Sequence, residues 1–255
     1  MTNSKKNDAR SLPKRFYKDV SVAEAGGPDD PRGYQLLLDG RPVKTPGKLL
    51  ISVPARQLAD ALAEEWRAQA ETIDPATMAM TRIVNSSLDG VSGREVEVAA
   101  DIAAFAGSDL TCYRADGPED LVALQAAAWD PVLAWAREAF GGRFVVAQGV
   151  MPVEQPPESI AVFAGELAGY EALQLGALHV MTTLTGSALI ALAHAHGVLS
   201  TEEAWAVAHV DEDFQIARWG ADEDAAERRT KRWAEFRAAS RIFMYSAAAL
   251  NADCG

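Results

Sequence analysis

The sequence has little of what several classes of function require. Its two cysteines, Cys112 and Cys254, are too few and too far apart to indicate a disulfide scaffold or a zinc site, so we expect a reducing compartment. It contains no G-x-G-x-x-G motif, and GRPVKTPGK at residues 40–48 lacks the spacing and the final Ser or Thr of a phosphate loop. The basic first residues include Asp8 and lack the apolar run of a secretory signal. Disulfide-rich, nucleotide-binding and secreted proteins are therefore not expected.

Positive charge is scarce after the first residues. Six basic residues against one Asp give residues 1–18 a charge of +5, which leaves −17 for the rest of a chain whose net charge is −12. A strongly acidic body repels phosphate, which argues against a nucleic-acid partner. Hydrophobic residues make up 49% of the chain, which is enough for a folded core. We expect residues 1–12 to form a disordered tail in front of a folded acidic protein.

Charge of either sign is missing from one long stretch. No Asp, Glu, Lys or Arg lies between Glu171 and Glu202, although charged residues make up 24% of the chain. Residues 172–196 are apolar or small all around a helical wheel, which is typical of a helix buried among other helices or in a bilayer. Polar side chains within the run, and the lack of a basic flank or an aromatic belt, favour the buried helix. We expect one central helix here, approached closely at its small residues Gly176, Gly186 and Ser187.

Residues 13–88 are predicted to form a small α+β domain. Asp39-Gly40 fits a two-residue turn with positive φ and predicts a hairpin between the segments on either side. Pro54 opens a helix through Gln69 with one apolar stripe, which should pack on the sheet. The expected strands cover residues 15–22, 34–38, 41–44 and 49–53.

Residues 89–250 are predicted to form a helical domain around the central helix. Ser200 and Glu203 make a capping box, which fixes the start of a helix from Thr201 to about Trp219. The Asp130-Pro131 pair should restart or kink the helix that contains it. The other expected helices cover residues 95–106, 119–140, 158–170 and 222–249, with a short extended piece at 143–147.

Candidate catalytic groups are few. His209 is four residues from Asp213 and three from Glu212, so the three side chains could share a ligand, but no further ligand is in view. Ser187 lacks the second glycine of a nucleophile elbow. The basic residues of the last expected helix alternate with Glu227 and Glu235, as on a solvated helix face.

One stretch, VDEDFQIARWG at residues 210–220, is harder to explain by packing alone. Trp205, Glu212 and Trp219 are seven residues apart and so lie on one side of a helical wheel, away from the apparent core side of Phe214 and its neighbours. Two tryptophans beside a carboxylate form either a second packing surface or a binding surface. Tryptophan is frequent at binding hot spots.

That stretch and others resemble a known family, the assembly chaperones for the alpha subunit of the catalytic head of F-type ATP synthase, found in mitochondria and alphaproteobacteria. The chain has Ala79-Met80 where the family often has Pro-Leu, and residues 1–12 and those after about 221 carry little of the resemblance. The matching segments are RFYKDV (15–20), YQLLLDGRPVKTPGK (34–48), LADALAEEWRAQ (58–69), IDPATMAMTRIVNSSLDGV (73–91), DLTCYRADGPEDLVALQAAAWDPVLAWA (109–136), GVMPVEQP (149–156), LTGSALIALA (184–193) and VDEDFQIARWG (210–220).

The resemblance implies a non-enzymatic chaperone with a small α+β domain followed by a helical one. Such a chaperone binds the newly made alpha subunit and covers the surface that later meets the beta subunit. It implies no ATP hydrolysis and no cofactor. From the residues we expect no metal, no nucleic-acid partner and no membrane insertion. We also expect a monomer in a bacterial cytoplasm, with the mitochondrial matrix as the alternative.

The resemblance and the helical wheel together give a set of partner-binding residues. The alternative function is a small-molecule or metal-dependent enzyme with its site near His209, Glu212 and Asp213. The expected partner-binding residues are Trp205, Asp211, Glu212, Asp213, Gln215 and Trp219.

Overall fold

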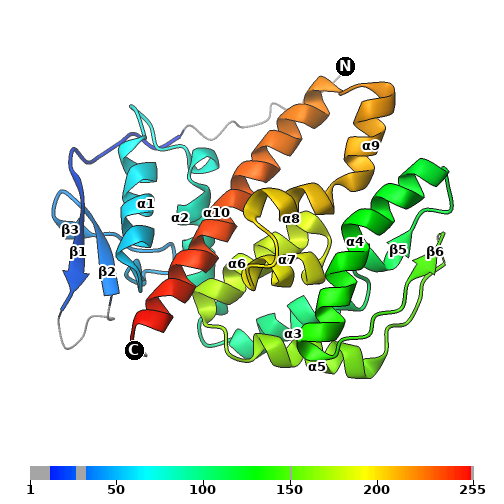
Figure 1. Ribbon diagram of the computed structural model, residues 1–255. Helices are drawn as coiled ribbons and strands as arrows, with labels where there is room; N and C mark the ends of the chain where they lie inside the picture. The colour runs from blue at the N-terminus through cyan, green and yellow to red at the C-terminus, as the bar shows by residue number, and fades with distance from the viewer. Residues whose placement is uncertain (1–11, 27–32, 150, 254–255) are drawn as a thin grey trace, which may run out of the picture.

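A small antiparallel sheet forms one end of the molecule, and the rest is mostly helical (Figure 1). The computed structural model describes residues 12–26, 33–149 and 151–253, so most of the expected disordered tail lies outside the described residues. The arrangement is the α+β fold that the sequence predicts. The strands are β1 (Val20–Ala25), β2 (Gly33–Leu38), β3 (Arg41–Pro42) and β4 (Ser52–Val53), and β2 pairs with the other three.

The predicted hairpin is confirmed, but the first strand is displaced. Asp39 and Gly40 have φ of 47° and 75°, as a turn with two left-handed residues requires. The strand predicted at residues 15–22 begins only at Val20. The chain before β1 pairs with a different segment, since the backbone N–H of Arg15 donates to the carbonyl of Glu71 at 2.9 Å.

Helix α1 (Arg56–Arg67) packs on the sheet, and the chain then passes into the helical part. Leu58 and Leu62 are fully buried, as the apolar stripe predicts, and Trp66 is half-buried. Helix α2 (Ala79–Ser86) continues into a π-helical turn at Ser87–Val91. The following elements are α3 (Glu95–Ala106), β5 (Tyr113–Arg114), α4 (Glu119–Phe140), β6 (Ala147–Gln148) and α5 (Pro157–Leu167).

Two expectations in this part need correction. Helix α4 runs through Pro131 as one helix, so a restart at that residue is wrong, while a kink there stays a prediction. The extended piece expected at 143–147 is displaced to β6, which pairs in parallel with β5.

The expected single central helix is two helices, α6 (Ala172–Thr185) and α7 (Ala188–Ala195). Gly186 ends α6 with a φ of +68°, a conformation that suits glycine, and the Ser187 hydroxyl accepts from the backbone N–H of Ile190 at 3.0 Å to start α7. Gly186 and Ser187 therefore serve as caps, whereas Gly176 is the site of close packing. A Cβ added at Gly176 would lie 2.0 Å from the Ser87 hydroxyl oxygen.

The new N-terminus of α7 is held by a buried carboxylate from far away in the sequence. Asp109 is fully buried and accepts from the Ser187 hydroxyl at 2.7 Å and from the backbone N–H of Leu189 at 3.0 Å. Thr111 donates to the same carboxylate through its backbone N–H and its hydroxyl. No helix in the described part of the chain is both long and apolar enough to cross a bilayer.

The helix expected from Thr201 to Trp219 is also divided. The capping box is confirmed, because Ser200 and Glu203 exchange both hydrogen bonds at the start of α8 (Thr201–Ala208). The helix then breaks at His209, where φ is −115° and ψ is 22°, and α9 (Val210–Trp219) sets off in a new direction.

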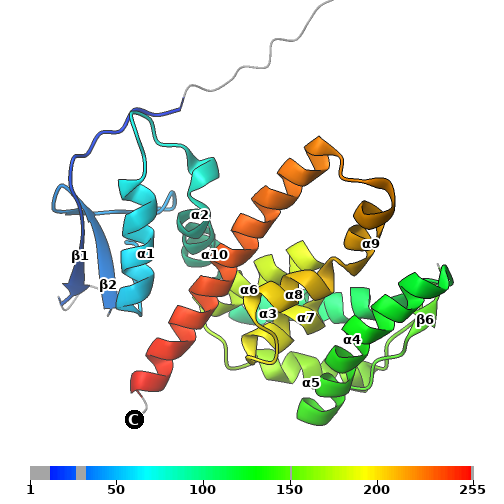
Figure 2. The same cartoon turned by 45° about the horizontal axis from the view of Figure 1, so that its top comes forward.

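Helix α10 (Glu223–Asp253) crosses the whole molecule (Figures 1 and 2). It packs against α6 and α7 in the helical part and against α1 and α2 beside the sheet. The buried apolar side chains of both parts form one continuous cluster. The predicted boundary between residues 88 and 89 falls inside the π-helical turn and stays a prediction.

Candidate functional site

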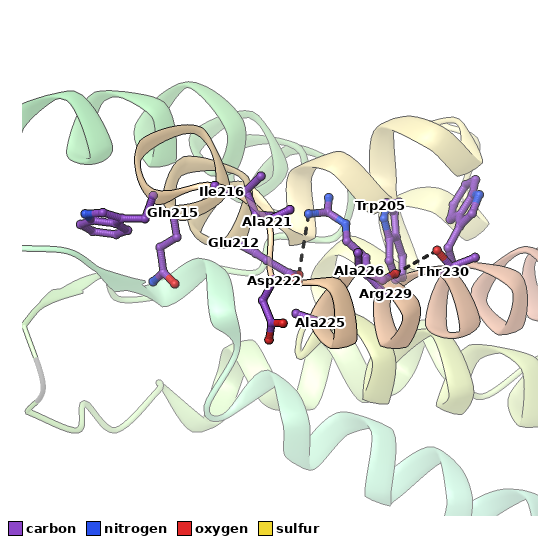
Figure 3. Close-up of a pocket in the computed structure, with 13 residues that line it drawn as sticks. Trp205, Glu212, Gln215, Ile216, Ala221, Asp222, Ala225, Ala226, Arg229 and Thr230 are labelled. Atoms are coloured by element: carbon purple, nitrogen blue, oxygen red, sulfur yellow. Dashed lines mark hydrogen bonds and ion pairs between the residues drawn. The ribbon is translucent and has the colours of Figure 1, made fainter.

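Helices α9 and α10 form a hairpin that encloses a pocket of about 590 Å³ (Figure 3). The connection turns at Gly220, whose φ of 85° and ψ of 167° favour glycine. In the close-up, Glu212, Gln215 and Ile216 come from α9, and Ala225, Ala226, Arg229 and Thr230 come from α10. The remaining lining residues are Trp205, Trp219, Gly220, Ala221, Asp222 and Trp233.

The two tryptophans that the wheel places together differ sharply in exposure. Trp205 is 8% exposed and packs its ring 5.3 Å from Trp233 and 5.5 Å from Phe236, measured between centroids. Trp219 is 74% exposed. Because the helix breaks at His209, the seven-residue alignment does not hold in space, although both side chains line the pocket. Trp205 is therefore a packing residue in its floor, and Trp219 presents an apolar surface to solvent.

The acidic first turn of α9 faces a cation from α10. The Arg229 guanidinium lies 2.5 Å from a carboxylate oxygen of Asp213 and 3.9 Å from one of Glu212 (Figure 3 draws the second contact). The hydrogen bond to Asp213 raises the pKa of Arg229. The pairing fastens the hairpin and leaves Glu212 at one side of the pocket with about a third of its side chain exposed.

The group His209, Glu212 and Asp213 does not make a metal site. Burial lowers the pKa of His209, whose Nδ1 lies 2.7 Å from the Trp205 carbonyl and whose ring stacks 3.8 Å from the Trp205 ring. Asp213 turns instead to Arg229. Within the described residues no three His, Cys, Asp or Glu side chains gather as a metal would require. The alternative of an enzyme at these residues has no support.

Asp211 points away from the pocket toward α4. Its carboxylate accepts from the Gln125 side chain at 2.7 Å, and Arg218 at the other end of α9 pairs with Asp120 at 3.0 Å. These two contacts tie α9 to α4 at both ends. Of the six expected partner-binding residues, four line the pocket, while Asp211 and Asp213 hold its walls in place. Their role in partner binding stays a prediction.

The contribution of α10 to the pocket is not among the predicted features. Trp233 and Asp222 line the pocket, and Arg229 pairs across the hairpin rather than along its own helix. Only Lys231 with Glu227 shows the expected pairing four residues apart. A usable signal was present: an acidic helix, a glycine and a basic helix in succession indicate an antiparallel pair with complementary charge.

Solved structures with the same architecture show which family the chain belongs to. Atp12 from Paracoccus denitrificans is 38% identical, with a TM-score of 0.82 over 92% of this chain and 98% of that one. The profile of the family described as ATP12 chaperone protein matches residues 14–137. This chain belongs to the ATP12 chaperone family.

Two further proteins show the same likeness. The Atu1473 protein of Agrobacterium tumefaciens is 50% identical, with a TM-score of 0.85 over 92% of this chain and 86% of that one. The protein named "Protein atp12, mitochondrial" of Schizosaccharomyces pombe is 23% identical over 230 residues, which cover 84% of this chain and 76% of that protein. Proteins similar to this chain are thus found in bacteria and in a mitochondrion. The α9–α10 pocket lies beyond the segment that the ATP12 profile matches, but the solved ATP12 structures cover 92% of the chain.

Proposed function

We propose that this ATP12-family protein is an assembly chaperone that binds the free alpha subunit of F-type ATP synthase through the α9–α10 pocket. The observation that carries the choice of surface is Trp219, a large apolar side chain that is 74% exposed beside a pocket. Tryptophan dominates binding hot spots, and an exposed apolar patch marks an interaction site. The relatives in two bacteria support a bacterial cytoplasm as the location of this activity.

The pocket suits a transient partner. An unassembled subunit exposes apolar surface that will later be buried in a permanent interface, and that surface is an aggregation hazard. A chaperone must cover it and then yield to the larger permanent interface. The pocket combines apolar walls from Trp219, Ile216 and Ala225 with carboxylates at Glu212 and Asp222. Apolar contact supplies affinity, while the carboxylates select the partner and speed encounter.

The test is co-purification of the tagged protein with ATP synthase alpha and beta subunits expressed beside it. We expect capture of free alpha, and loss of that capture as beta is added. Trp219→Ala should weaken capture of alpha at least tenfold, since hot-spot tryptophans contribute about 2 kcal/mol or more. Val198→Ala, at an exposed apolar residue outside the pocket, is the matched control and should bind normally.

The possible failures are separable. No capture of alpha by the unaltered protein would refute the chaperone proposal. Capture that survives Trp219→Ala would leave the chaperone function standing and place the contact on another surface.

A further inference from the structure

A second pocket, of about 560 Å³, is lined by residues of the sheet region. The sheet lies at the opposite end of the molecule from α9 (Figures 1 and 2). It is bounded by the chain just before β1, by the turn and strand that follow β2, and by α1. We call it the N-terminal pocket. Its lining residues are Phe16, Tyr17, Leu38, Asp39, Arg41, Pro42, Val43, Lys44 and Trp66.

The apolar part of the N-terminal pocket is a row of three aromatic rings. Phe16 is 73% exposed and meets Tyr17 edge-on, with ring centroids 5.4 Å apart. Tyr17 lies 5.5 Å from Trp66 in turn and donates its hydroxyl to the Trp66 carbonyl at 2.6 Å. The indole N–H of Trp66 has no acceptor among the described residues. A phenylalanine held in solvent beside a pocket, on an aromatic base fixed by a hydrogen bond, is arranged for contact with another molecule.

The charge around this pocket is opposite to that of the molecule. Arg41 and Lys44 line it, are exposed, and form no ion pair with a carboxylate within the part of the chain that the structure describes. The one lining carboxylate, Asp39, accepts from the backbone N–H groups of Lys18 and Asp19 at 3.0 and 2.8 Å, and these bonds lower its pKa. Its charge is therefore engaged by the fold. The charge of Arg41 also lowers the pKa of Asp39, so two cations and one hydrogen-bonded carboxylate line this pocket on a protein whose net charge is −12.

We propose that the N-terminal pocket binds an acidic segment of a partner protein, with an apolar side chain against Phe16 and a carboxylate at Arg41 and Lys44. Arginine and lysine recognise carboxylates through charge-assisted hydrogen bonds, and Arg41 offers the planar fork that a carboxylate fits. The α9–α10 pocket presents carboxylates at Glu212 and Asp222, so the two pockets select partners, or parts of one partner, of opposite charge. A nucleic acid would need a far larger basic surface on so acidic a molecule.

The test uses two fluorescein-labelled peptides and the full-length protein, with binding followed by fluorescence anisotropy. The acidic probe is Glu-Asp-Leu-Phe-Leu-Glu-Asp and the basic probe is Lys-Lys-Leu-Phe-Leu-Lys-Lys, so both carry the same apolar centre. The net charge of the protein favours the basic probe at long range. We expect the protein to bind the acidic probe, at the N-terminal pocket, at least tenfold more tightly than the basic probe. Trp219→Ala should leave the affinity for the acidic probe unchanged.

Matched variants locate the contact. Lys44→Glu should weaken the acidic probe at least tenfold, whereas Lys48→Glu, which changes the net charge equally outside the pocket, should not. Phe16→Ala should lower the affinity for the acidic probe to a similar degree. Leu49→Ala, at another exposed apolar residue of the same region, should leave that affinity unchanged.

Three outcomes would overturn the proposal. One is equal loss in Lys44→Glu and Lys48→Glu, since that would show general charge repulsion. Another is acidic-probe binding that does not change in Phe16→Ala. The third is concentration-dependent self-association on a sizing column that Phe16→Ala abolishes, since the surface would then join copies of this chain.

Discussion

At the scale of single residues, two tryptophans of this chain differ in role, one in packing and one in recognition. Trp66 is half-buried, and its ring and carbonyl both contact Tyr17. Trp219 is 74% exposed and has no ring or hydrogen-bond partner within the described residues. The same substitution should therefore destabilise the protein at Trp66 and leave its stability nearly unchanged at Trp219.

Trp66→Arg should lower the free energy of unfolding by about 3 kcal/mol, because it removes aromatic packing and places a charge against an apolar core. Trp219→Arg should change it by less than about 0.5 kcal/mol. Urea denaturation of both variants measures the difference. Equal losses would mean that Trp219 is structural, and no loss at Trp66 would mean that its contacts with Tyr17 stabilise nothing.

His209 gives a pH dependence whose sign follows from its burial. Burial lowers the pKa of His209 below its ordinary value of about 6.5, so the folded state binds fewer protons there than the unfolded state. Its contribution to stability is present at neutral pH and is lost as the pH falls through about 6.5 toward the lower pKa of the folded state. Glu212 opposes this shift, whereas Arg229 and Arg232 add to it.

Lowering the pH from 8 to 5.5 should therefore lower the urea concentration at the midpoint of unfolding. His209→Asn should make this decrease smaller. His196→Asn, at a histidine whose side chain is 33% exposed, is the control for the loss of an imidazole. An identical fall in all three proteins would show that His209 is not the group responsible.

The breaks between helices show at the scale of elements what sequence reading can and cannot find. The capping box at Ser200 was predictable because both partners lie three residues apart. The break at Gly186 has a local cap, because Ser187 accepts from Ile190, but the Asp109 carboxylate that completes the start of α7 lies 80 residues before Leu189 and could not be predicted. The break at His209 has neither a glycine nor a proline to announce it. Local hydrogen bonds can be read from the chain, but partners supplied by folding cannot.

The same distinction applies to the site. Four of six expected residues line the α9–α10 pocket because they share one short helix or the helix before it. Arg229 and Trp233 were not expected because their place depends on how α10 folds back beyond Gly220. The N-terminal pocket also depends on a long-range contact, since Phe16 comes beside α1 only when the chain before β1 pairs with Glu71.

Asp109→Ala should destabilise the protein by about 3 kcal/mol, because the buried Ser187 hydroxyl and Leu189 N–H lose their shared acceptor. Asp109→Asn keeps an acceptor oxygen and should cost less. Thermal or urea unfolding of the two variants tests the order. If Asn costs as much as Ala, the charge rather than the hydrogen bonds holds the start of α7.

At the scale of the whole molecule, α10 joins the sheet region to the helical region. Because one apolar cluster runs through both, we expect the full chain to unfold in a single transition. Far-ultraviolet circular dichroism and tryptophan fluorescence should give coincident urea curves. A fragment of residues 12–92 should stay unfolded, since it lacks the face of α10 that covers α1 and α2. Two separated transitions would show that the boundary near residue 88 divides independent domains.

The contacts along α10 also restrict which insertions and deletions the sequence can tolerate. Near its start, Arg229 must point toward α9, and further along, Glu235 must point toward Arg82 on α2. An α-helix advances about 100° per residue, so one residue inserted between these positions would turn one contact away from its partner. A loop absorbs such an insertion, but a helix fixed at two places cannot. The segment from Arg229 to Glu235 should therefore tolerate substitutions far better than changes of length.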